Sequence, residues 1–222
     1  KINKILRVNS IKSVFGLEDI LEVSKQKLQR GFLMLPKTSH PKELQIVDAI
    51  FKETQTSVKL IALVETLQGI KNIDEIANAT ESLSFIMFGA ADYAAELNCQ
   101  MTAEALSYAR SRILVAAKLA NILSIDSPCM DIKDQHAVME ESKLAKSLGF
   151  SGKALIHPAN VKITNEIFSP TKKEIDEATE ILSIFNASSD GVVSINGKLI
   201  DKPVITRMQQ ILSLAESIGK NV

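Results

Sequence analysis

Short apolar runs alternate with longer segments of helical periodicity along most of the chain. Such runs, of about four to eight residues and each followed by a helical pattern, are typical of parallel β/α units. Six of them are expected to form strands, at residues 4–8, 31–35, 59–64, 83–88, 123–126 and 153–156. The pattern therefore predicts an α/β fold built on a parallel sheet.

The segments between these runs carry helix start and stop signals. Thr102 precedes a periodic segment at 103–119, and Gly149 follows another at 135–148, as capping residues do. The helix at 103–119 has one broad face of small and apolar residues, which predicts close packing against the sheet. That face comprises Ala105, Ala109, Ile113, Ala116, Ala117 and Ala120.

The pattern changes after the last predicted strand. Residues 171–185 have helical periodicity, and Asn196-Gly197 is a strong short-range signal for a β-hairpin. Pro203 fits the first turn of a final helix that ends near Ile218. Residues 188–222 are therefore expected to form a hairpin-plus-helix extension rather than another β/α unit.

The composition is that of a soluble globular protein. The chain has 26 Lys and Arg against 26 Asp and Glu, and 45% of its 222 residues are hydrophobic. No run approaches the roughly 18 apolar residues of a membrane span, and no basic block is present. These features argue against a membrane or a nucleic acid as partner and favour a small-molecule site.

Cysteine usage and the first residue add two expectations. Cys99 and Cys129 lack CxxC spacing, so neither a disulfide framework nor a zinc site is predicted, and a reducing, cytoplasmic location is expected. The chain begins with Lys1 and almost at once enters a predicted strand. We therefore expect the sequence to start inside a longer protein.

A polar or charged residue stands at or just past the carboxyl end of every predicted strand. In order these are Arg7 and Asn9, Lys37, Glu65, Asp92, Asp126 with Asp131, and His157. Carboxyl ends of parallel strands converge on one face, where the loops build the site. Any one of these residues could simply mark where a strand emerges into solvent, but together they favour a functional site.

The residue types suggest particular chemistry, with alternatives for each. Glu65 and Asp92 follow neighbouring predicted strands and suit Mg²⁺ or Mn²⁺; either could instead be a helix N-cap. Arg7 could bind a carboxylate or enolate oxygen, or be a surface arginine. Lys37 could form a Schiff base or be solvated, and His157 could be a general base or a hydrogen-bonded strand end. No glycine-rich nucleotide motif is present.

Seven short motifs, occurring in one order, make the sequence recognisable. They are Leu6-Arg7-Val8-Asn9, Met34-Leu35-Pro36-Lys37, Ile61-Ala62-Leu63-Val64-Glu65-Thr66, Phe88-Gly89-Ala90-Ala91-Asp92-Tyr93-Ala94-Ala95-Glu96-Leu97, Ala109-Arg110-Ser111-Arg112, Gly152-Lys153-Ala154-Leu155-Ile156-His157-Pro158 and Gly197-Lys198-Leu199-Ile200-Asp201-Lys202-Pro203-Val204. In these motifs the chain resembles the citrate lyase beta-subunit-like branch of the HpcH/HpaI aldolase family. The resemblance covers nearly the whole chain.

The resemblance implies a (β/α)8 TIM barrel with its metal site at the carboxyl ends of the strands. Glu65 and Asp92 match the family's magnesium ligands, Arg7 matches its substrate- and enolate-binding arginine, and Lys37 and Glu65 are expected to border the substrate. In the acyl-CoA branch, the aspartate matching Asp201 comes from a neighbouring subunit and acts as acid and base. A homo-oligomer, with a trimer favoured, is therefore implied.

The chain departs from the family pattern in two ways. Family members usually carry Glu before the metal-binding aspartate and often Pro after the glutamate-threonine pair, where this chain has Ala91 and Leu67. The family's first two strands also have no counterpart. We therefore expect an incomplete barrel of six strands over residues 1–187, and a hairpin and helix at 188–222 that pack on a neighbouring subunit.

The activity that the resemblance implies is a magnesium-dependent lyase reaction. The enzyme would cleave a 3-hydroxyacyl-CoA such as citryl-, malyl- or citramalyl-CoA into acetyl-CoA and a 2-oxo acid, or catalyse the reverse reaction. Both directions would pass through a metal-stabilised enolate. Two alternatives remain open at this point. One is a metal-dependent aldolase acting on free 2-oxo acids, and the other is a catalytically degenerate paralogue that binds a partner.

Overall fold

The computed structural model describes residues 3–187, 193–195 and 198–220. These residues fall into two compact units, Lys1–Pro158 and Ala159–Val222. The boundary predicted at 187/188 separates the barrel from the segment that is expected to pack on a neighbouring subunit. That boundary stays a prediction.

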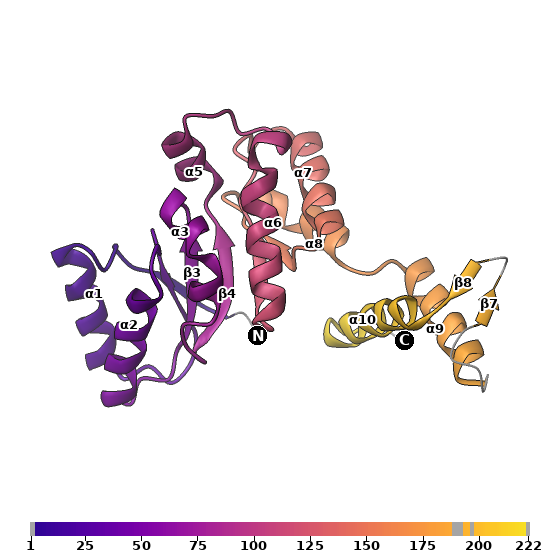
Figure 1. Ribbon diagram of the computed structural model, residues 1–222, viewed down its shortest axis with the longest axis horizontal. Helices are drawn as coiled ribbons and strands as arrows, with labels where there is room; N and C mark the ends of the chain where they lie inside the picture. The colour runs from indigo at the N-terminus through magenta and orange to yellow at the C-terminus, as the bar shows by residue number, and fades with distance from the viewer. Residues whose placement is uncertain (1–2, 188–192, 196–197, 221–222) are drawn as a thin grey trace. The chain divides into compact units, whose positions relative to one another are not determined.

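The first unit is built on one parallel sheet of six strands (Figure 1). The strands, in chain order, are β1 (Ile5–Arg7), β2 (Phe32–Leu35), β3 (Lys59–Val64), β4 (Leu83–Phe88), β5 (Leu123–Asp126) and β6 (Gly152–Lys153). Their order in the sheet is the same as their order in the chain. Every connection therefore advances in one direction, as in a barrel, whereas a doubly wound sheet reverses direction part-way. The result is a curled half-barrel.

Helices connect the strands and cover the sheet (Figure 1). They are α1 (Val14–Lys25), α2 (Pro41–Glu53), α3 (Leu67–Lys71), α4 (Ile73–Ala77), α5 (Ala90–Leu97), α6 (Ala103–Leu119) and α7 (Gln135–Leu148). The predicted caps of two of them are confirmed: the Thr102 hydroxyl accepts from the Ala105 N–H at 3.2 Å, and Gly149 ends α7 at φ +107°.

The core lies where the central strands meet the small faces of the helices. From Leu60 to Val64, β3 is at most 3% exposed. On α6, Ala109, Ile113 and Ala116 are at most 1% exposed, so the predicted small-residue face does pack inward. Small side chains there allow the helix to approach the sheet closely.

The last predicted strand is shorter than expected. Residues 153–156 were expected to form it from their apolar pattern, but β6 is only Gly152–Lys153. Ile156 is 55% exposed, because the chain leaves the sheet after Lys153 and no neighbouring strand of the described residues lies beyond β6. The apolar run therefore predicts that a strand lies near this position, but not where the strand begins and ends.

The second unit combines helices with a small hairpin. It contains α8 (Val161–Phe168), α9 (Lys172–Ala187), β7 (Val193–Ile195), β8 (Lys198–Ile200) and α10 (Lys202–Ser217), and the short 3₁₀ helix η1 (Pro158–Asn160) precedes them. The antiparallel pairing of β7 with β8 confirms the predicted hairpin, whose turn residues Asn196 and Gly197 lie outside the described residues. Pro203 stands in the first turn of α10, as predicted.

Apolar residues of α9, β8 and α10 hold the second unit together. The buried cluster consists of Ala178, Ile181, Ile200, Ile205 and Met208. Within the described residues of both units, no helix is both long and apolar enough to span a membrane.

Candidate functional site

Four of the predicted site residues lie at the carboxyl ends of four adjacent strands. Arg7 is the last residue of β1, and Lys37 follows β2 by two residues. Glu65 directly follows β3, and Asp92 lies in the first turn of α5, which follows β4. Because these strands are neighbours in a parallel sheet, the four side chains come from one edge.

Glu65 is buried and held in one orientation. It is 3% exposed, and its Oε1 accepts a hydrogen bond from the backbone N–H of Lys37 at 2.9 Å. Gly89 lies against its other side, where a Cβ atom would come within 2.6 Å of the Glu65 Oε2. The glycine therefore leaves the space that the carboxylate occupies.

Asp92 is half exposed and faces the Lys37 side chain. Its Oδ1 lies 3.2 Å from the Lys37 Nζ, and the two side chains are 49% and 55% exposed. Lys37 thus contacts both carboxylates, through its backbone on Glu65 and through its ammonium on Asp92.

Neither carboxylate serves as a helix N-cap, so that alternative is wrong. The N-cap of α5 is Gly89, three residues before Asp92. The residue that caps α3 is Thr66, whose hydroxyl accepts from the Gly69 N–H at 3.0 Å. Glu65 and Asp92 therefore remain free of that structural task.

The pKa of Glu65 reflects both its burial and the charges around it. Burial raises the pKa of Glu65 above its ordinary value, and the charge of Asp92 raises it further. The Lys37 N–H bond and the charges of Arg7 and Lys37 lower the same pKa, by less in total. A divalent cation between the carboxylates would relieve their repulsion.

This donor set fits Mg²⁺. Among the described residues no group of three or more His, Cys, Asp or Glu side chains could hold a metal. Mg²⁺ needs no such group, because it typically binds one or two carboxylates and takes its other ligands from water and substrate oxygens. Glu65 and Asp92 match that requirement.

A hollow of about 430 Å³ lies between the loops that follow β1 and β2. It is lined by Arg7, Val8, Asn9, Ser10, Pro36 and Lys37. Two larger hollows, of about 820 and 780 Å³, lie at the amino ends of the strands, away from these carboxylates. We place the candidate site at the smaller hollow because Arg7 and Lys37 line it and Lys37 contacts Glu65 and Asp92, which are not themselves part of the lining.

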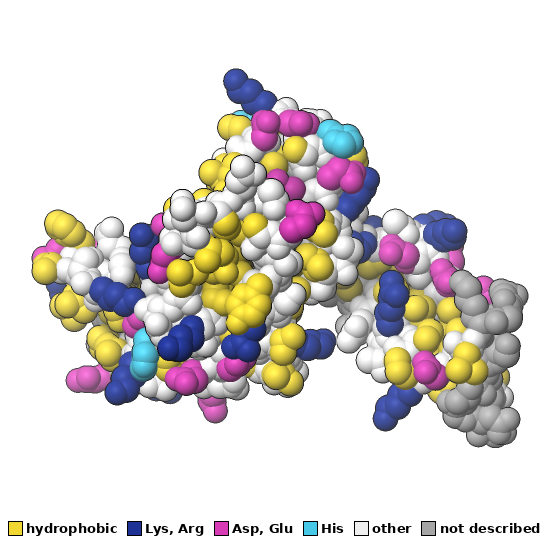
Figure 2. Space-filling model, turned by 45° about the horizontal axis from the view of Figure 1, so that its top comes forward, with side chains coloured by type: hydrophobic (Ala, Val, Ile, Leu, Met, Phe, Trp, Pro, Cys, Tyr) yellow, Lys and Arg dark blue, Asp and Glu magenta, His cyan; other side chains and the backbone are white. Residues whose placement is uncertain are grey.

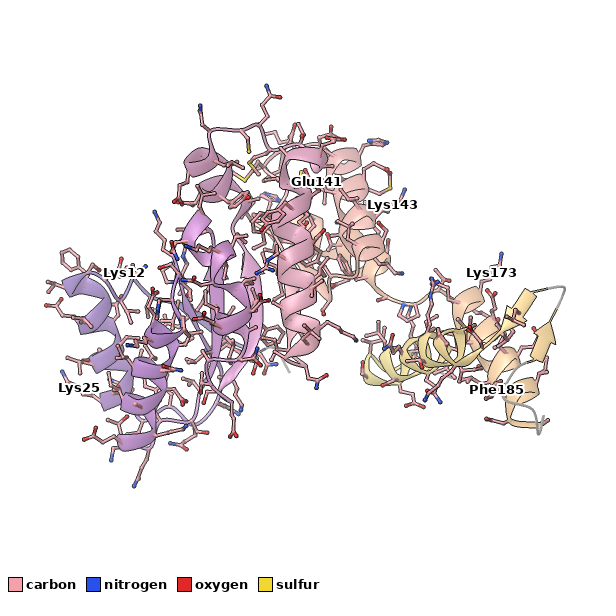
Figure 3. All side chains as sticks on the ribbon, viewed as in Figure 1. Lys12, Lys25, Glu141, Lys143, Lys173 and Phe185 are labelled. Atoms are coloured by element: carbon pink, nitrogen blue, oxygen red, sulfur yellow. The ribbon has the colours of Figure 1, made fainter. Side chains whose placement is uncertain are left out.

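Lys12 is a site-bordering residue that the sequence reasoning missed. Labelled in Figure 3, it donates from Nζ to the Lys37 carbonyl at 3.3 Å and to the Ser39 hydroxyl at 2.6 Å. It also pairs with Glu43 at 3.0 Å. It thereby ties the loop after β1 to the loop after β2, a contact that no motif in the sequence indicates.

A buried ionic network lies next along the same edge, and of its members the sequence analysis singled out Asp126 alone as a strand-end residue. The Asp126 carboxylate accepts from the Arg110 Nε at 3.0 Å and from the Lys153 Nζ at 3.1 Å. Glu141, on α7 and labelled in Figure 3, lies 3.0 Å from the same ammonium. The signal available in the sequence was Arg110 on the otherwise apolar face of α6.

The remaining predicted residues have structural surroundings of their own. Asp201, in the second unit, is the N-cap of α10, and its Oδ1 accepts from the Val204 N–H at 3.4 Å. His157 is exposed, after the end of β6. Cys129 is buried, and burial together with Glu141 raises the pKa of its thiol to about 11, so it is protonated near neutrality.

Comparison with known proteins identifies the family. Residues 1–158 match the sequence model of the HpcH/HpaI aldolase/citrate lyase family. The chain belongs to this family. Within the family, the chain is 32% identical to the citrate lyase subunit beta of Haemophilus influenzae over 229 residues, which cover 98% of this chain and 78% of that protein.

Two further family members are similar over nearly the whole chain. The mitochondrial citramalyl-CoA lyase of Homo sapiens is 30% identical over 97% of this chain and 69% of its own length. The structure of CitE from Mycobacterium tuberculosis in complex with magnesium, acetoacetate and coenzyme A is 26% identical, with a TM-score of 0.77 over 96% of this chain and 78% of that one.

Proposed function

We propose that this protein is a magnesium-dependent lyase acting on coenzyme A esters. It would cleave or form a carbon–carbon bond of a 3-hydroxyacyl-CoA of the citryl-, malyl- or citramalyl-CoA class, with acetyl-CoA and a 2-oxo acid as the other partners. The observation that carries the proposal is the pair Glu65 and Asp92 at the carboxyl ends of neighbouring strands. The similarity to proteins named as CoA-ester lyases supports it.

Glu65 and Asp92 would hold the Mg²⁺ ion. When bound, the ion would supply Lewis-acid polarisation of the oxo-acid oxygens. Arg7, the exposed end of β1, would bind a substrate carboxylate or the developing enolate oxygen through its guanidinium. The Lys37 ammonium, half exposed beside Asp92, would contact the substrate.

Proton transfer would fall to Asp201 from a neighbouring subunit. A base must take the hydroxyl proton, and an acid must protonate the enolate carbon. We therefore propose a homo-oligomer, with a trimer favoured, in which the second unit of one subunit completes the site of the next. The hydrogen bond that the Asp201 carboxylate accepts from Val204 is long, at 3.4 Å, which supports a further contact of this carboxylate with a substrate.

We further propose that the six-stranded sheet is part of an eight-stranded barrel. The strand order, which advances in one direction, supports this. So do apolar side chains with little cover at the β1 end of the sheet: Ile5 is 53% exposed, and Phe15 on α1 is 68% exposed. In Figure 2 hydrophobic side chains are visible at the left end, where α1 lies.

The cytoplasmic location of the protein, expected from its cysteine usage, stays a prediction.

The test is isothermal titration of the full chain with Mg²⁺ and oxaloacetate or pyruvate. We expect binding that requires the metal and is lost in Asp92→Asn. A matched control is Glu53→Gln, an exposed carboxylate at the end of α2, which is expected to bind as the parent does. Absence of binding in the parent at millimolar ligand would contradict the proposal and favour a degenerate paralogue.

A second assay separates the lyase from the aldolase alternative. Incubation with malyl- or citramalyl-CoA in the presence of Mg²⁺ is expected to yield acetyl-CoA and the 2-oxo acid. Turnover of free hydroxy-oxo acids with none of the thioesters would instead identify an aldolase on free 2-oxo acids.

A further inference from the structure

Lys37 has a backbone conformation that its surroundings must impose. Five non-glycine residues of the described chain have positive φ: Lys27, Lys37, Gln55, Asn98 and Asn121. Four of them end helices, where a left-handed residue is a normal cap. Lys37, at φ +53°, instead follows strand β2. Such a residue is strained, and strain of this kind concentrates at functional sites.

Hydrogen bonds on both sides of Lys37 hold it in this conformation. The next residue, Thr38, is fully buried; its N–H donates to the Leu63 carbonyl at 3.1 Å and its hydroxyl to the Leu35 carbonyl at 2.8 Å. The Lys37 carbonyl accepts from the Lys12 Nζ at 3.3 Å. The turn is therefore fixed by β2 and β3 and by the loop after β1, independently of the Lys37 side chain.

In this conformation the backbone N–H of Lys37 is directed toward the Glu65 carboxylate. The Lys37 N–H reaches the Glu65 Oε1 at 2.9 Å, while Gly89 borders the Oε2 side. A hydrogen bond to a buried charged acceptor is stronger than one between neutral groups. The carboxylate is thus held between a backbone donor and a glycine.

We propose that the left-handed backbone of Lys37, and not its ammonium group, orients the Glu65 carboxylate for binding a divalent cation. Lys37 is in this sense a positioning residue. The inference rests on the proposed function, because it concerns the same metal site. The ammonium has a lesser effect on cation binding, since its pair with Asp92 is half exposed and screened by solvent.

The test separates backbone from side chain with three variants. Lys37→Gly removes the ammonium and adopts the left-handed conformation freely. Lys37→Met removes the ammonium with a backbone preference like that of lysine. Lys37→Val also disfavours the left-handed conformation, because its side chain is β-branched.

The probe is Mn²⁺, whose binding to the full chain is measured by electron paramagnetic resonance. We expect the glycine and methionine variants to bind within about threefold of the parent and the valine variant at least about tenfold more weakly, as when a group supporting a metal ligand is lost. The matched control is Lys27, which has φ +45° at the end of α1. Lys27→Val is expected to lower thermal stability and leave Mn²⁺ binding unchanged.

The three Lys37 variants distinguish a backbone effect on Mn²⁺ binding from an effect of the ammonium group. Equal weakening in the methionine and valine variants would assign the effect to the ammonium and overturn the inference, as would parent-like binding by the valine variant. If the parent itself does not bind Mn²⁺, the proposed function fails, and the inference fails with it.

Should the valine variant not fold, hydrogen exchange of the Lys37 amide gives a second test. Exchange is expected to be slow in the parent and at least about tenfold faster in Glu65→Ala, which removes the acceptor. An exchange rate unchanged by Glu65→Ala would overturn the inference.

Discussion

At the residue scale, the candidate site depends on what Gly89 lacks. It is the N-cap of α5, and its N–H donates to the Val64 carbonyl at 2.9 Å, which brings the backbone of this turn against the end of β3. A side chain at position 89 would occupy the space of the Glu65 carboxylate. The absence of a single methyl group therefore determines where a metal ligand can lie.

Substitution of this glycine is expected to disable the site. In Gly89→Ala, the new Cβ would lie within 2.6 Å of the Glu65 Oε2, so the carboxylate must move. We expect Mg²⁺ affinity, measured by titration calorimetry, to fall at least about tenfold. Gly152→Ala is the control, because nothing lies within 4 Å of a Cβ there. Unchanged affinity in Gly89→Ala would contradict the geometry.

Asp201 combines a visible structural task with a proposed chemical one, and two substitutions separate them. Serine can cap α10 as aspartate does but cannot act as a carboxylic acid or base, whereas alanine can do neither. We expect Asp201→Ser to keep the melting temperature of the parent and to lose at least about 100-fold in turnover of malyl-CoA. Asp201→Ala should lose both stability and turnover. Turnover by the serine variant within a few-fold of the parent would refute the catalytic role.

At the scale of elements, the Arg110–Asp126–Lys153 network joins α6 to β5 and β6. The side chains of Asp126 and Lys153 are at most 1% exposed, and that of Arg110 is 7% exposed. Removing the Asp126 carboxylate would leave Arg110 without this partner and Lys153 with only the partly exposed carboxylate of Glu141. The network thus acts as a polar connection inside a mostly apolar layer.

We expect Asp126→Asn to destabilise the protein by about 3 kcal/mol, because Arg110 and Lys153 would keep their buried charges without this carboxylate. Urea unfolding measures the loss. Asp74→Asn is the matched control. Its partner Arg112 lies on α6, as Arg110 does, but the side chains of Arg112 and Asp74 are 35% and 58% exposed, and we expect a loss below about 1 kcal/mol. Equal losses would show that burial is not the cause.

A second connection between elements predicts a dependence on pH. Asp48 on α2 is 7% exposed and accepts hydrogen bonds from Ser82 and from Lys52. Burial alone would raise the pKa of Asp48, but the bonds from Lys52, Ser82 and Thr80 outweigh it and lower the pKa. A lowered pKa means that the carboxylate contributes stability above its ordinary pKa and loses that contribution as pH falls through the folded value.

Asp48→Asn should therefore be less stable than the parent near pH 7, by about 1 kcal/mol. The difference between the two should begin to shrink as the pH falls below about 4, the ordinary pKa, and should vanish only below the lowered pKa of the folded protein, where the parent's carboxyl is also neutral. Denaturant unfolding at pH 7 and pH 3 tests this. A difference that is constant with pH would show that the charge of Asp48 has no part in stability.

How far the sequence predicts these elements depends on whether their signals are local. Alternating strand and helix patterns located the strands, and the caps at Thr102 and Gly149 are local signals that the structure confirms. The length of β6 was not predictable, because Ile156 is apolar yet exposed once the chain leaves the sheet. Burial of that segment depends on neighbours outside its own pattern.

The candidate site shows the same division. That polar residues at strand ends share one edge follows from the rule for parallel sheets, so the positions of Glu65 and Asp92 were predictable. The left-handed backbone of Lys37 and the contact of Gly89 with Glu65 were not, because both arise from contacts between separate loops. Family motifs included these residues without indicating what they do.

At the scale of the whole molecule, the proposed barrel closure makes a prediction about the β1 edge. The Lys4 carbonyl and the Val8 N–H bond to β2, so by alternation the N–H groups of Ile5 and Arg7 point away from β2. If another strand pairs with β1 in the native assembly, these two amides should exchange slowly with deuterium. Fast exchange at both, beside slow exchange at Leu33 in the same sheet, would contradict closure at this edge.

The strand order has a consequence for how the protein is made. Within the described six-stranded sheet, each strand after β1 pairs with the one synthesised just before it, so none of these pairings has to wait for a distant part of the chain. A ribosome could therefore release the sheet one β/α unit at a time, each new unit finding its partner already in place. The deeply buried β3 would gain its second neighbour only when β4 emerges, which makes the arrival of β4 the step at which the nascent chain first acquires a protected interior.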